Sequence, residues 1–413
     1  MTHSVSTHRR RHLAAVGSVV LTAGLLLSAC GGSSSSGDSS APATDAASTS
    51  SDASGGGETA GGDLAAFEAA AQEAVDAAKA DQTPETAPVP TGGPAPSSGV
   101  KLVIIPCSMA VEGCARSARS AKEAGELLGW DVTIDDPSQG QGGPSAAVQR
   151  AVASGADAIM TTSIDAGAIK ADLQAARDAG IVVVSNMAGN ADDLYQAIVP
   201  PLEVNFDAGY LLGQQAYLNA QETFGQPVKA IVFEDDEFAT VQQRIAGFKQ
   251  FIDDCAAAGG GCELLAEDKH LAADIATTLP NRVVQTIKQH PDYNTLFVGF
   301  DAALNQVITQ GLIPANLADP ATSQAFSVDC DVANAKIVAE GGVQNACIGF
   351  AFQRAGYGHV DNINRLLNGE SPADQGLVGK LVVQENAAGL TEKAWDGDFD
   401  AIPLYLEAWG VQQ

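Results

Sequence analysis

Apolar runs that alternate with helical periodicity begin at Lys101 and continue almost to the end of the chain. Residues 101–105 form an apolar run of strand-forming types after the first lysine, and Ala118, Ala121 and Leu128 then recur on one helix face. This pattern predicts a strand, a loop and a helix, the first unit of a parallel sheet. The connecting loop should lie at the carboxyl edge of that sheet, where open α/β sheets bind ligands.

Two series of such units follow. In the first we expect strands over 101–105, 131–134, 158–161 and 181–185, with helices over 117–128, 146–154 and 166–179. In the second we expect strands over 229–233, 295–299, 324–328, 348–351 and 380–383, with helices over 206–222, 241–256, 279–289, 302–310, 332–340 and 358–367. The alternation predicts an α/β protein with two lobes and a cleft, and such clefts are preferred ligand sites.

The first 29 residues have the pattern of an export signal. Residues 1–11 are positively charged, residues 13–27 are apolar and small, and the segment is too short for a stable membrane span. The sequence Leu27-Ser28-Ala29-Cys30 resembles a bacterial lipobox, in which the cysteine becomes the lipidated first residue of the mature protein. We therefore expect residues 1–29 to be a lipoprotein signal peptide and Cys30 to carry the lipid.

The next two segments are expected to lead from the lipid anchor to the folded part. Residues 30–62 consist almost wholly of Ser, Gly, Ala, Asp and Thr, which predicts a disordered tether. Residues 63–98 are expected to form a helix that Asp63 caps and that ends at Lys79, and then a proline-rich linker. An apolar stripe that includes Phe67 favours weak docking of this helix on the folded domain.

Composition limits the class of partner. The chain has 413 residues, more than one ordinary core holds, and a formal net charge of -28. So acidic a surface repels nucleic acid and anionic lipid, and we expect neither as a direct partner. The sequence contains no nucleophile with a neighbouring base, no oxyanion motif and no metal-ligand spacing, which argues against an enzyme and predicts no cofactor and no metal.

The cysteine pattern agrees with export. Of seven cysteines, those other than Cys30 are even in number, as expected for disulfides in an oxidising compartment. Many pairings are open, and the spacing favours those within one strand–helix or turn unit, namely Cys107 with Cys114, Cys255 with Cys262, and Cys330 with Cys347. Zinc binding is disfavoured, because no CxxC pair occurs and the histidines are scattered.

Several stretches resemble, in order, those of a known family. They are residues 121–130, 153–159, 163–166, 179–185, 244–248, 290–292, 297–311, 327–329 and 366–370. Their order resembles the type I periplasmic solute-binding proteins, in particular the ribose-binding-like group that serves sugar ABC transporters. The resemblance covers residues 99–385.

The resemblance implies an α/β fold of two Rossmann-like lobes with parallel sheets, joined by a three-crossing hinge. The crossings would fall near Asn205, near residues 352–353 and near residues 383–384. The N-terminal lobe would then hold residues 99–204 plus 354–383, and the C-terminal lobe residues 205–353 plus 384–413. Ligand would close the lobes, and the closed form would be recognised by a permease. A monomer is expected.

Ligand positions can be carried over only where the sequence aligns with the family. Asp329 falls where sugar binders place a carboxylate that accepts hydroxyl hydrogen bonds. Asp301 lies beside a polar pair of the family, whose preceding amide residue is Phe300 here. The hinge glutamine of the family falls at Phe352 or at Gln353.

Other positions depart from the family pattern. The Asp-Arg pair that sugar binders carry after the fourth strand is Asn186-Met187 here, and the arginine expected on the second-lobe helix is Gln242. The paired aromatics of the first loop are absent, and that loop contributes Glu112 instead. Ser163, which follows the third strand, completes the predicted ligand-binding set.

These departures change the predicted chemistry of the pocket. A sugar site needs planar polar side chains for hydroxyls and aromatic faces for the C–H surface of the ring. Phe300, Phe352 and Phe238 are candidates for the faces. Loss of the arginine-type donors, together with Glu112, favours a polyol, an amino sugar or another cationic solute over an anion.

Each candidate also has a structural alternative. Asp301 precedes a helix and is equally suited to be its N-cap, Asp329 and Asn186 to be turn residues, and Glu112 to be a solvated loop acid. Phe300 and Phe352 would then be core residues. Arg244 matches a neighbour of the family arginine, and the structural interpretation, in which it pairs with the acidic residues 234–237, is favoured.

The tail resembles a calcium-binding loop. Asp396, Asp398 and Asp400 alternate, with Glu407 at the twelfth position, but Ala401 replaces the glycine that the sharp turn needs. The favoured alternative is an acidic surface segment near the hinge.

Together these observations predict a lipid-anchored, extracytoplasmic receptor that hands a small polar solute, a sugar or polyol, to an ABC importer. One alternative in the same fold is a ligand-sensing receptor for an amine or amino acid. A rival of another class is a surface hydrolase that uses Asp301 and Asp329 as acid and base.

Overall fold

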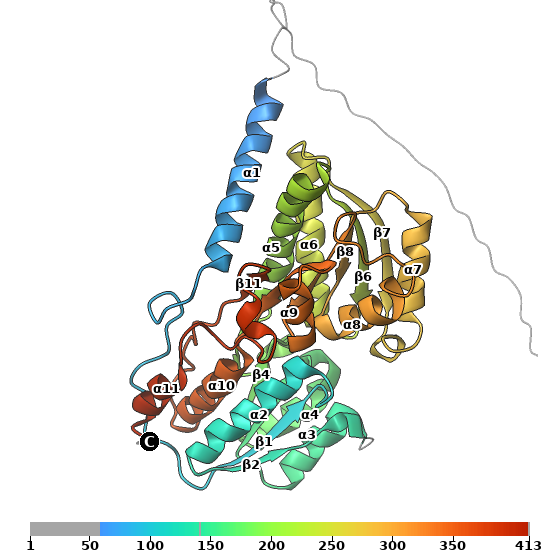
Figure 1. Cartoon of the computed structure of the whole chain (residues 1–413). Coiled ribbons are helices and arrows are strands. Elements are labelled where there is room, and N and C mark those ends of the chain that lie inside the picture. Colours follow the sequence, from blue (N-terminus) through green and yellow to red (C-terminus); the bar gives the residue numbers. More distant parts are fainter. Residues whose placement is uncertain (1–57, 140–141, 412–413) are drawn as a thin grey trace, which may run out of the picture. The chain divides into compact units, whose positions relative to one another are not determined.

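The computed structural model describes residues 58–139 and 142–411 (Figure 1). The predicted signal peptide, the lipidation site Cys30 and most of the predicted tether lie outside these residues. In the described part, no helix combines the length and the apolar character that a membrane crossing needs.

The first lobe is built on a five-stranded parallel sheet. Its strands are β1 (Lys101–Pro106), β2 (Asp131–Ile134), β3 (Ala158–Thr162), β4 (Val182–Asn186) and β5 (Ala197–Ile198), in the order β2-β1-β3-β4-β5. Its helices are α2 (Glu112–Leu127), α3 (Gly143–Ala153), α4 (Lys170–Asp178), α10 (Phe352–Leu367) and α11 (Ile402–Trp409).

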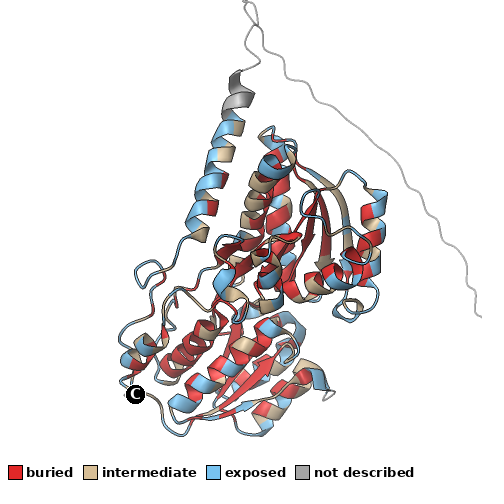
Figure 2. Cartoon of the chain, viewed as in Figure 1, coloured by how far each residue is buried: buried red, intermediate tan, exposed pale blue. Residues whose placement is uncertain are grey.

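The apolar run of β1 is buried because both faces of this sheet are covered. Leu102 and Ile104 belong to a core cluster shared with α2, α10 and α11. Val103 and Ile105 point the other way, into a cluster shared with α3 and α4. Figure 2 shows most strands of both lobes as buried elements between their helices.

The second lobe is built on a six-stranded sheet. Its strands are β6 (Lys229–Asp235), β7 (Glu263–His270), β8 (Thr295–Val298), β9 (Gln324–Asp329), β10 (Gln344–Gly349) and β11 (Lys380–Val383), in the order β11-β10-β9-β8-β6-β7. Its helices are α5 (Val204–Asn219), α6 (Ala239–Ala257), α7 (Leu279–Gln289), α8 (Asp301–Gln306) and α9 (Val332–Ala339). The pattern did not predict β7, because this edge strand carries four charged residues and only its last residue is buried.

The chain crosses between the lobes from β5 to α5, from β10 to α10, from α10 to β11 and from β11 to α11, so its tail differs from the predicted hinge of three crossings. Strand β11, expected in the first lobe, pairs antiparallel with β10 in the second sheet. Residues 384–413 were expected in the second lobe, but helix α11 within them, which the pattern did not predict, packs on α10 in the first. The reason is burial: Leu381 completes the core of the second lobe, whereas Tyr405 and Trp409 pack against Tyr357 of α10.

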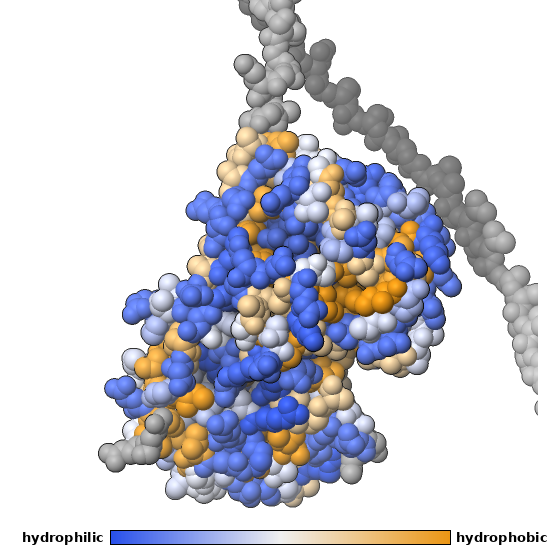
Figure 3. Space-filling view, viewed as in Figure 1, coloured by the Kyte–Doolittle hydropathy of each residue, from blue (hydrophilic) through white to orange (hydrophobic). Residues whose placement is uncertain are grey.

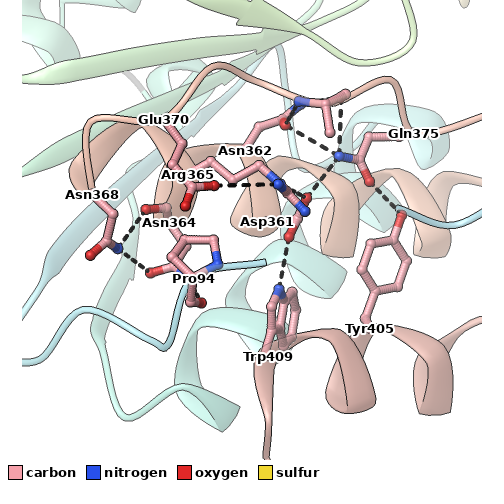
Figure 4. A network of polar contacts seen from close by, with 11 residues as sticks. Pro94, Asp361, Asn362, Asn364, Arg365, Asn368, Glu370, Gln375, Tyr405 and Trp409 are labelled. Atoms are coloured by element: carbon pink, nitrogen blue, oxygen red, sulfur yellow. Dashed lines mark hydrogen bonds and ion pairs between the residues drawn. The ribbon is translucent and has the colours of Figure 1, made fainter. Parts of the chain in front are cut away.

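A segment before the first lobe packs on both lobes, and we call residues 63–98 the strap. Helix α1 (Glu58–Lys79) begins earlier than predicted and lies along α5, where the Phe67 ring contacts Tyr217 and Phe251. The linker then follows the first lobe, where Pro94 accepts a hydrogen bond from Asn364 of α10 at 2.9 Å. Figure 4 shows this contact beside the buried network of Asp361, Arg365, Gln375, Tyr405 and Trp409.

Three disulfides form, and they pair the cysteines as the spacing predicted. They join Cys107 to Cys114, Cys255 to Cys262, and Cys330 to Cys347. The first links the end of β1 to the start of α2, and the third links the loop after β9 to β10. Two of the three therefore hold loops at the carboxyl edges of the sheets.

Candidate ligand-binding cleft

A cavity of about 80 Å³ lies where the carboxyl edges of the two sheets face each other. The first lobe lines it with residues that follow β1, β3 and β4, and the second lobe with residues that follow β6, β7, β8 and β9. Figure 3 shows a notch between the lobes on one face of the molecule. The lining residues are Cys107, Val111, Gly113, Cys114, Ser163, Asn186, Met187, Phe238, Thr240, Val241, Arg244, Ala272, Ile275, Phe300, Asp329 and Phe352.

An ion pair between Arg244 and Asp329 forms the charged part of the lining. The guanidinium Nη2 donates to Asp329 Oδ1 at 2.8 Å and Nη1 donates to Asp329 Oδ2 at 3.3 Å, so the pair is bidentate. The side chains are only 5% and 10% exposed. Burial raises the pKa of Asp329, and the Arg244 guanidinium opposes that shift.

The loop after β9 holds Asp329 in an unusual backbone conformation. Asp329 has φ 109° and Cys330 has φ 48°, a region that residues other than glycine rarely adopt. The disulfide from Cys330 to Cys347 ties this loop to the neighbouring strand β10. Such strain is concentrated at functional sites, because the surrounding structure must hold it in place.

The aromatic part of the lining comes from three different segments. The Phe238 and Phe300 rings meet edge to face, with centroids 6.5 Å apart. Phe352 begins α10, and the guanidinium carbon of Arg116 lies 5.2 Å from the centre of its ring. A Cβ atom at Gly113 would come within 3.2 Å of the Phe352 ring, so this close approach favours glycine.

Five of the predicted ligand-binding residues line the cavity together. They are Asp329, Phe300, Asn186, Phe352 and Ser163. The structure therefore brings together residues that are up to 189 positions apart in sequence, between Ser163 and Phe352.

The other four predicted residues do not line it. Asp301 is fully buried beneath the second-lobe edge, where its carboxylate accepts hydrogen bonds from Ser327, Gln344 and the backbone N–H of Asp331. Burial, with the neighbouring charge of Asp331, raises the pKa of Asp301 well above its usual value. Gln242 is exposed and donates to the carbonyl of Asp236.

Glu112 and Gln353 also lie outside the lining, because one is exposed and the other lies beside the tail. Glu112 is an exposed residue in the first turn of α2. The backbone of Gln353 donates to Asp396 Oδ1 at 3.0 Å, which places this residue beside the tail.

Arg244 corrects the sequence interpretation most directly. It does not pair with residues 234–237 but with Asp329. The pocket therefore contains a guanidinium, whereas the sequence analysis predicted that its arginine-type donors are lost. Val111, Gly113, Met187 and the first disulfide were also missed as lining residues. Their apolar chemistry gave no signal in a search for polar ligand contacts, although Met187 directly follows Asn186.

The tail does not assemble the calcium loop that its acidic residues resemble. Asp396 pairs with Arg116 at 2.6 Å, and Asp398 pairs with Lys380 at 2.7 Å. Asp400 accepts a hydrogen bond from the backbone of Ile402. Over residues 58–139 and 142–411, no group of three His, Cys, Asp or Glu residues is arranged to hold a metal ion.

One hydrogen bond spans the cleft beside the cavity. Asp165 follows β3 in the first lobe, and its Oδ2 atom accepts a hydrogen bond from the backbone N–H of Ala239 at 3.3 Å. Ala239 is the first residue of α6, and the preceding Phe238 supplies no side-chain cap. A carboxylate from one lobe therefore caps a helix of the other.

Comparison with known proteins places these features in a family. Residues 103–371 match the family described as "Periplasmic binding protein domain", and the strap lies outside the match. A search of curated proteins found no match.

Solved structures with the same fold have low sequence identity to this chain. A galactofuranose binding protein is 19% identical, with a TM-score of 0.62 over 73% of this chain and 100% of its own. A protein from Mycobacterium smegmatis in complex with β-D-fucofuranose is 16% identical, with a TM-score of 0.59 over 71% of this chain and 95% of its own.

A third solved structure gives the same result. An ABC transporter solute binding protein from Bacillus halodurans C-125 with bound myo-inositol is 17% identical, with a TM-score of 0.60 over 72% of this chain and 99% of its own. The predicted α/β fold with parallel sheets in two lobes is thereby confirmed. The chain belongs to the periplasmic binding protein family, and its fold is the two-lobed α/β fold of the solved structures.

Proposed function

We propose that this protein binds a small sugar or polyol in its cleft and delivers it to an ABC permease, while a lipid on Cys30 holds it at the outer face of the cell membrane. The family consists of solute-binding proteins, which are not enzymes. The solved relatives include proteins bound to fucofuranose and to myo-inositol.

The observation that carries the proposal is the composition of the cavity lining. Arg244 and Asp329 offer a donor and an acceptor side by side, as a pair of neighbouring hydroxyls requires. Phe238, Phe300 and Phe352 supply faces for the C–H surface of a ring or chain. Both lobes contribute to the lining, so a bound solute would contact both at once.

Binding would act by shifting the equilibrium between open and closed lobes. A solute held by both lobes binds the closed form more tightly than the open form, and only this difference drives closure. The hydrogen bond from Ala239 to Asp165 spans the cleft, so it would be kept in a closed form and lost when the lobes separate. The permease would then distinguish the closed form from the open one.

The retained guanidinium favours a neutral solute over a cation. Arg244 would repel an amine that entered the cavity, and Asp329 is already neutralised by Arg244. A sugar or polyol therefore ranks ahead of an amine or amino acid. The ligand-sensing receptor for an amine remains the second outcome of the binding test.

A thermal-shift screen with isothermal titration calorimetry tests the ligand class. We expect a stabilising shift with sugars or polyols at about 1 mM, worth roughly 4 kcal/mol for a micromolar ligand. Stabilisation by amines or amino acids alone would contradict the sugar assignment. Stabilisation by none of these classes would contradict solute binding in this cleft.

A matched pair of variants tests the cleft itself. We expect Asp329→Asn to weaken binding of the identified solute at least tenfold, or about 1.4 kcal/mol. Asp361→Asn is the control, because Asp361 is also buried and also pairs with an arginine, Arg365, at 2.8 Å but lies away from the cavity. Equal affinities for the two variants would show that the cavity is not the binding site.

The anchor and the permease have their own tests. Cys30→Ser should release the exported protein from the membrane fraction, and mass spectrometry of the wild-type N-terminus should find the lipid on Cys30. Cross-linking of the closed protein in cells should capture permease subunits. Capture of a sensor kinase instead would favour the signalling role.

A further inference from the structure

Most of the cavity lining is apolar, and its charged groups lie together. The second lobe contributes the ion pair of Arg244 with Asp329 and the hydroxyl of Thr240, beside apolar residues that include Phe238 and Phe300. The first lobe contributes the apolar disulfide of Cys107 with Cys114, Val111, Gly113 and Met187, together with the polar Ser163 and Asn186. The charged hydrogen-bonding groups are therefore concentrated at the ion pair.

Most hydrogen-bonding groups of the ion pair already have partners within the protein, so few remain for a ligand. Nε of Arg244 donates to Asn205 at 2.9 Å, Nη1 to the carbonyl of Gly299 at 3.1 Å, and the other two bonds go to Asp329. Within the described residues, these contacts occupy four of the five N–H groups that a guanidinium carries. One N–H and the remaining lone pairs of Asp329 suffice for about two hydroxyls.

The polar residues of the first lobe add little to this capacity. Asn186 is only 2% exposed, and its amide nitrogen is directed at Ser117 Oγ of α2, 3.4 Å away. Ser163 adds one hydroxyl beside it. Met187, which follows Asn186, presents a thioether side chain that offers no hydrogen-bond donor.

The cavity is also small. Its volume of about 80 Å³ is about half the 150 Å³ of a cavity that accommodates benzene, so a short polyol fits it as it stands and a sugar ring fits only with the lobes further apart. A hydroxyl pressed against the apolar wall would lose its water and gain no partner, which is unfavourable. A methyl or methylene group in the same place would gain from burial.

We infer that the ligand has one hydroxylated edge, which Arg244 and Asp329 receive, and one apolar edge, which lies against Met187, Val111 and the first disulfide. This is the pattern of a deoxy sugar or of a short polyol that lacks one hydroxyl. The inference rests on the proposed function and narrows it to a class of solute.

Calorimetry with matched pairs of ligands tests this inference on the wild-type protein. The pairs are D-fucose with D-galactose, L-rhamnose with L-mannose, 2-deoxy-D-ribose with D-ribose, and propane-1,2-diol with glycerol. In the pair that binds most tightly, we expect the deoxygenated member to bind about tenfold better, since one buried hydroxyl without a partner has about that effect.

The outcomes separate this inference from the proposed function. Equal or tighter binding of the fully hydroxylated member would overturn the inference and leave solute binding intact. Binding of none of the eight compounds, nor of any other sugar or polyol, would overturn both.

Variants of the apolar wall give a second readout. Met187→Gln and Val111→Thr place hydrogen-bonding groups on this wall and should reduce the preference for the deoxygenated member at least threefold. Met109→Gln is the control, because Met109 belongs to the same lobe but does not line the cavity. An unchanged preference in both folded wall variants would overturn the inference.

Discussion

The two lobes are joined in contrasting ways on the hinge side and on the cleft side. On the hinge side the strap contacts both lobes: Lys79 pairs with Glu385 at 3.0 Å, Asp81 pairs with Lys380 at 2.7 Å, and the carbonyl of Pro88 accepts from Arg354 at 2.8 Å. On the cleft side, Asp165 accepts one long hydrogen bond from Ala239.

The two sides differ in the number of polar contacts because the hinge side must hold the lobes together while the cleft side must open and close. Redundant contacts make the hinge side insensitive to the loss of any one of them. Sparse contacts on the cleft side keep the free-energy difference between open and closed lobes small, so that a ligand can decide between them. The comparison predicts that removal of the basic partner from a buried ion pair will cost more beside the cleft, at Arg244, than on the hinge side, at Lys380.

The largest effect is expected from Arg244→Leu. This change leaves the buried Asp329 without its partner, and breaking a buried pair in this way costs about 3–5 kcal/mol. The double variant Arg244→Leu with Asp329→Leu should recover most of that stability but bind no solute. Urea denaturation measures both.

Lys380→Met provides the matched change on the hinge side. It should cost only about 1–2 kcal/mol, because Asp398 keeps hydrogen bonds from the Gln82 backbone and from Trp395 Nε1. A cost equal to that of Arg244→Leu would contradict the proposed redundancy of the hinge side.

Removal of the strap is the next test. A variant that begins at Gly99 loses the buried contacts of Ala71, Val75 and Ala87 and the ring contacts of Phe67. We expect a loss of about 3 kcal/mol, which is the gain from burying these side chains reduced by the conformational entropy that the strap recovers. Deletion of residues 31–57 is the control and should leave the free energy of unfolding unchanged. Equal stability of both variants would mean that the strap is not part of the stable fold.

The next effect concerns Asp331, which follows β9 in the second lobe and interacts electrostatically with Glu112 and Arg116 of the first. Burial and the charge of Asp329 raise the pKa of Asp331 to about 7, and its Oδ1 atom is buried without a partner among the described residues. Because the folded-state pKa lies above the unfolded value, the stability from this group is present below pH ~4 and is lost as pH rises through ~7.

Asp331→Asn should remove this contribution to the pH dependence. The variant should match the wild type near pH 4 and exceed its free energy of unfolding by about 4 kcal/mol at pH 8. Parallel stability curves for the two proteins would show that Asp331 titrates with an ordinary pKa.

The smallest effect is expected from Asp165→Asn. It removes the charge that caps α6 from the opposite lobe, which is worth about 0.5–1 kcal/mol or a two- to fivefold loss of affinity. The loss should appear in the dissociation rate, because the contact bridges the two lobes and must break before they separate. Asp172→Asn, on α4 of the same lobe, serves as the control and should leave that rate unchanged.

The elements and half of the predicted site followed from local patterns. Strands such as β1 and β4 are buried on both faces and read as unbroken apolar runs, whereas β7 is an exposed edge with charged residues and gives no such run. Phe300, Asp329, Asn186 and Ser163 lie at or just after strand ends, a position that the strand–helix alternation already marks as a ligand edge.

The remainder of the site depended on contacts that no local pattern encodes. Arg244 lies 85 positions from Asp329 in sequence, whereas the acidic residues 234–237, with which it was predicted to pair, are much nearer. Gln242 lies two residues before Arg244 on α6, and its side chain is exposed. An alignment error of two residues therefore selected this exposed amide in place of the buried guanidinium.

The sequence by itself determined the two α/β lobes, the pairing of the cysteines and the edges at which ligands bind, because hydrophobic periodicity and short-range spacing are local properties. Only the tertiary structure decided that β11 joins the second sheet, that α11 packs on α10 and that Arg244 neutralises Asp329. These are choices among partners distant in sequence, and they depend on which surfaces remain to be buried once the lobes have formed.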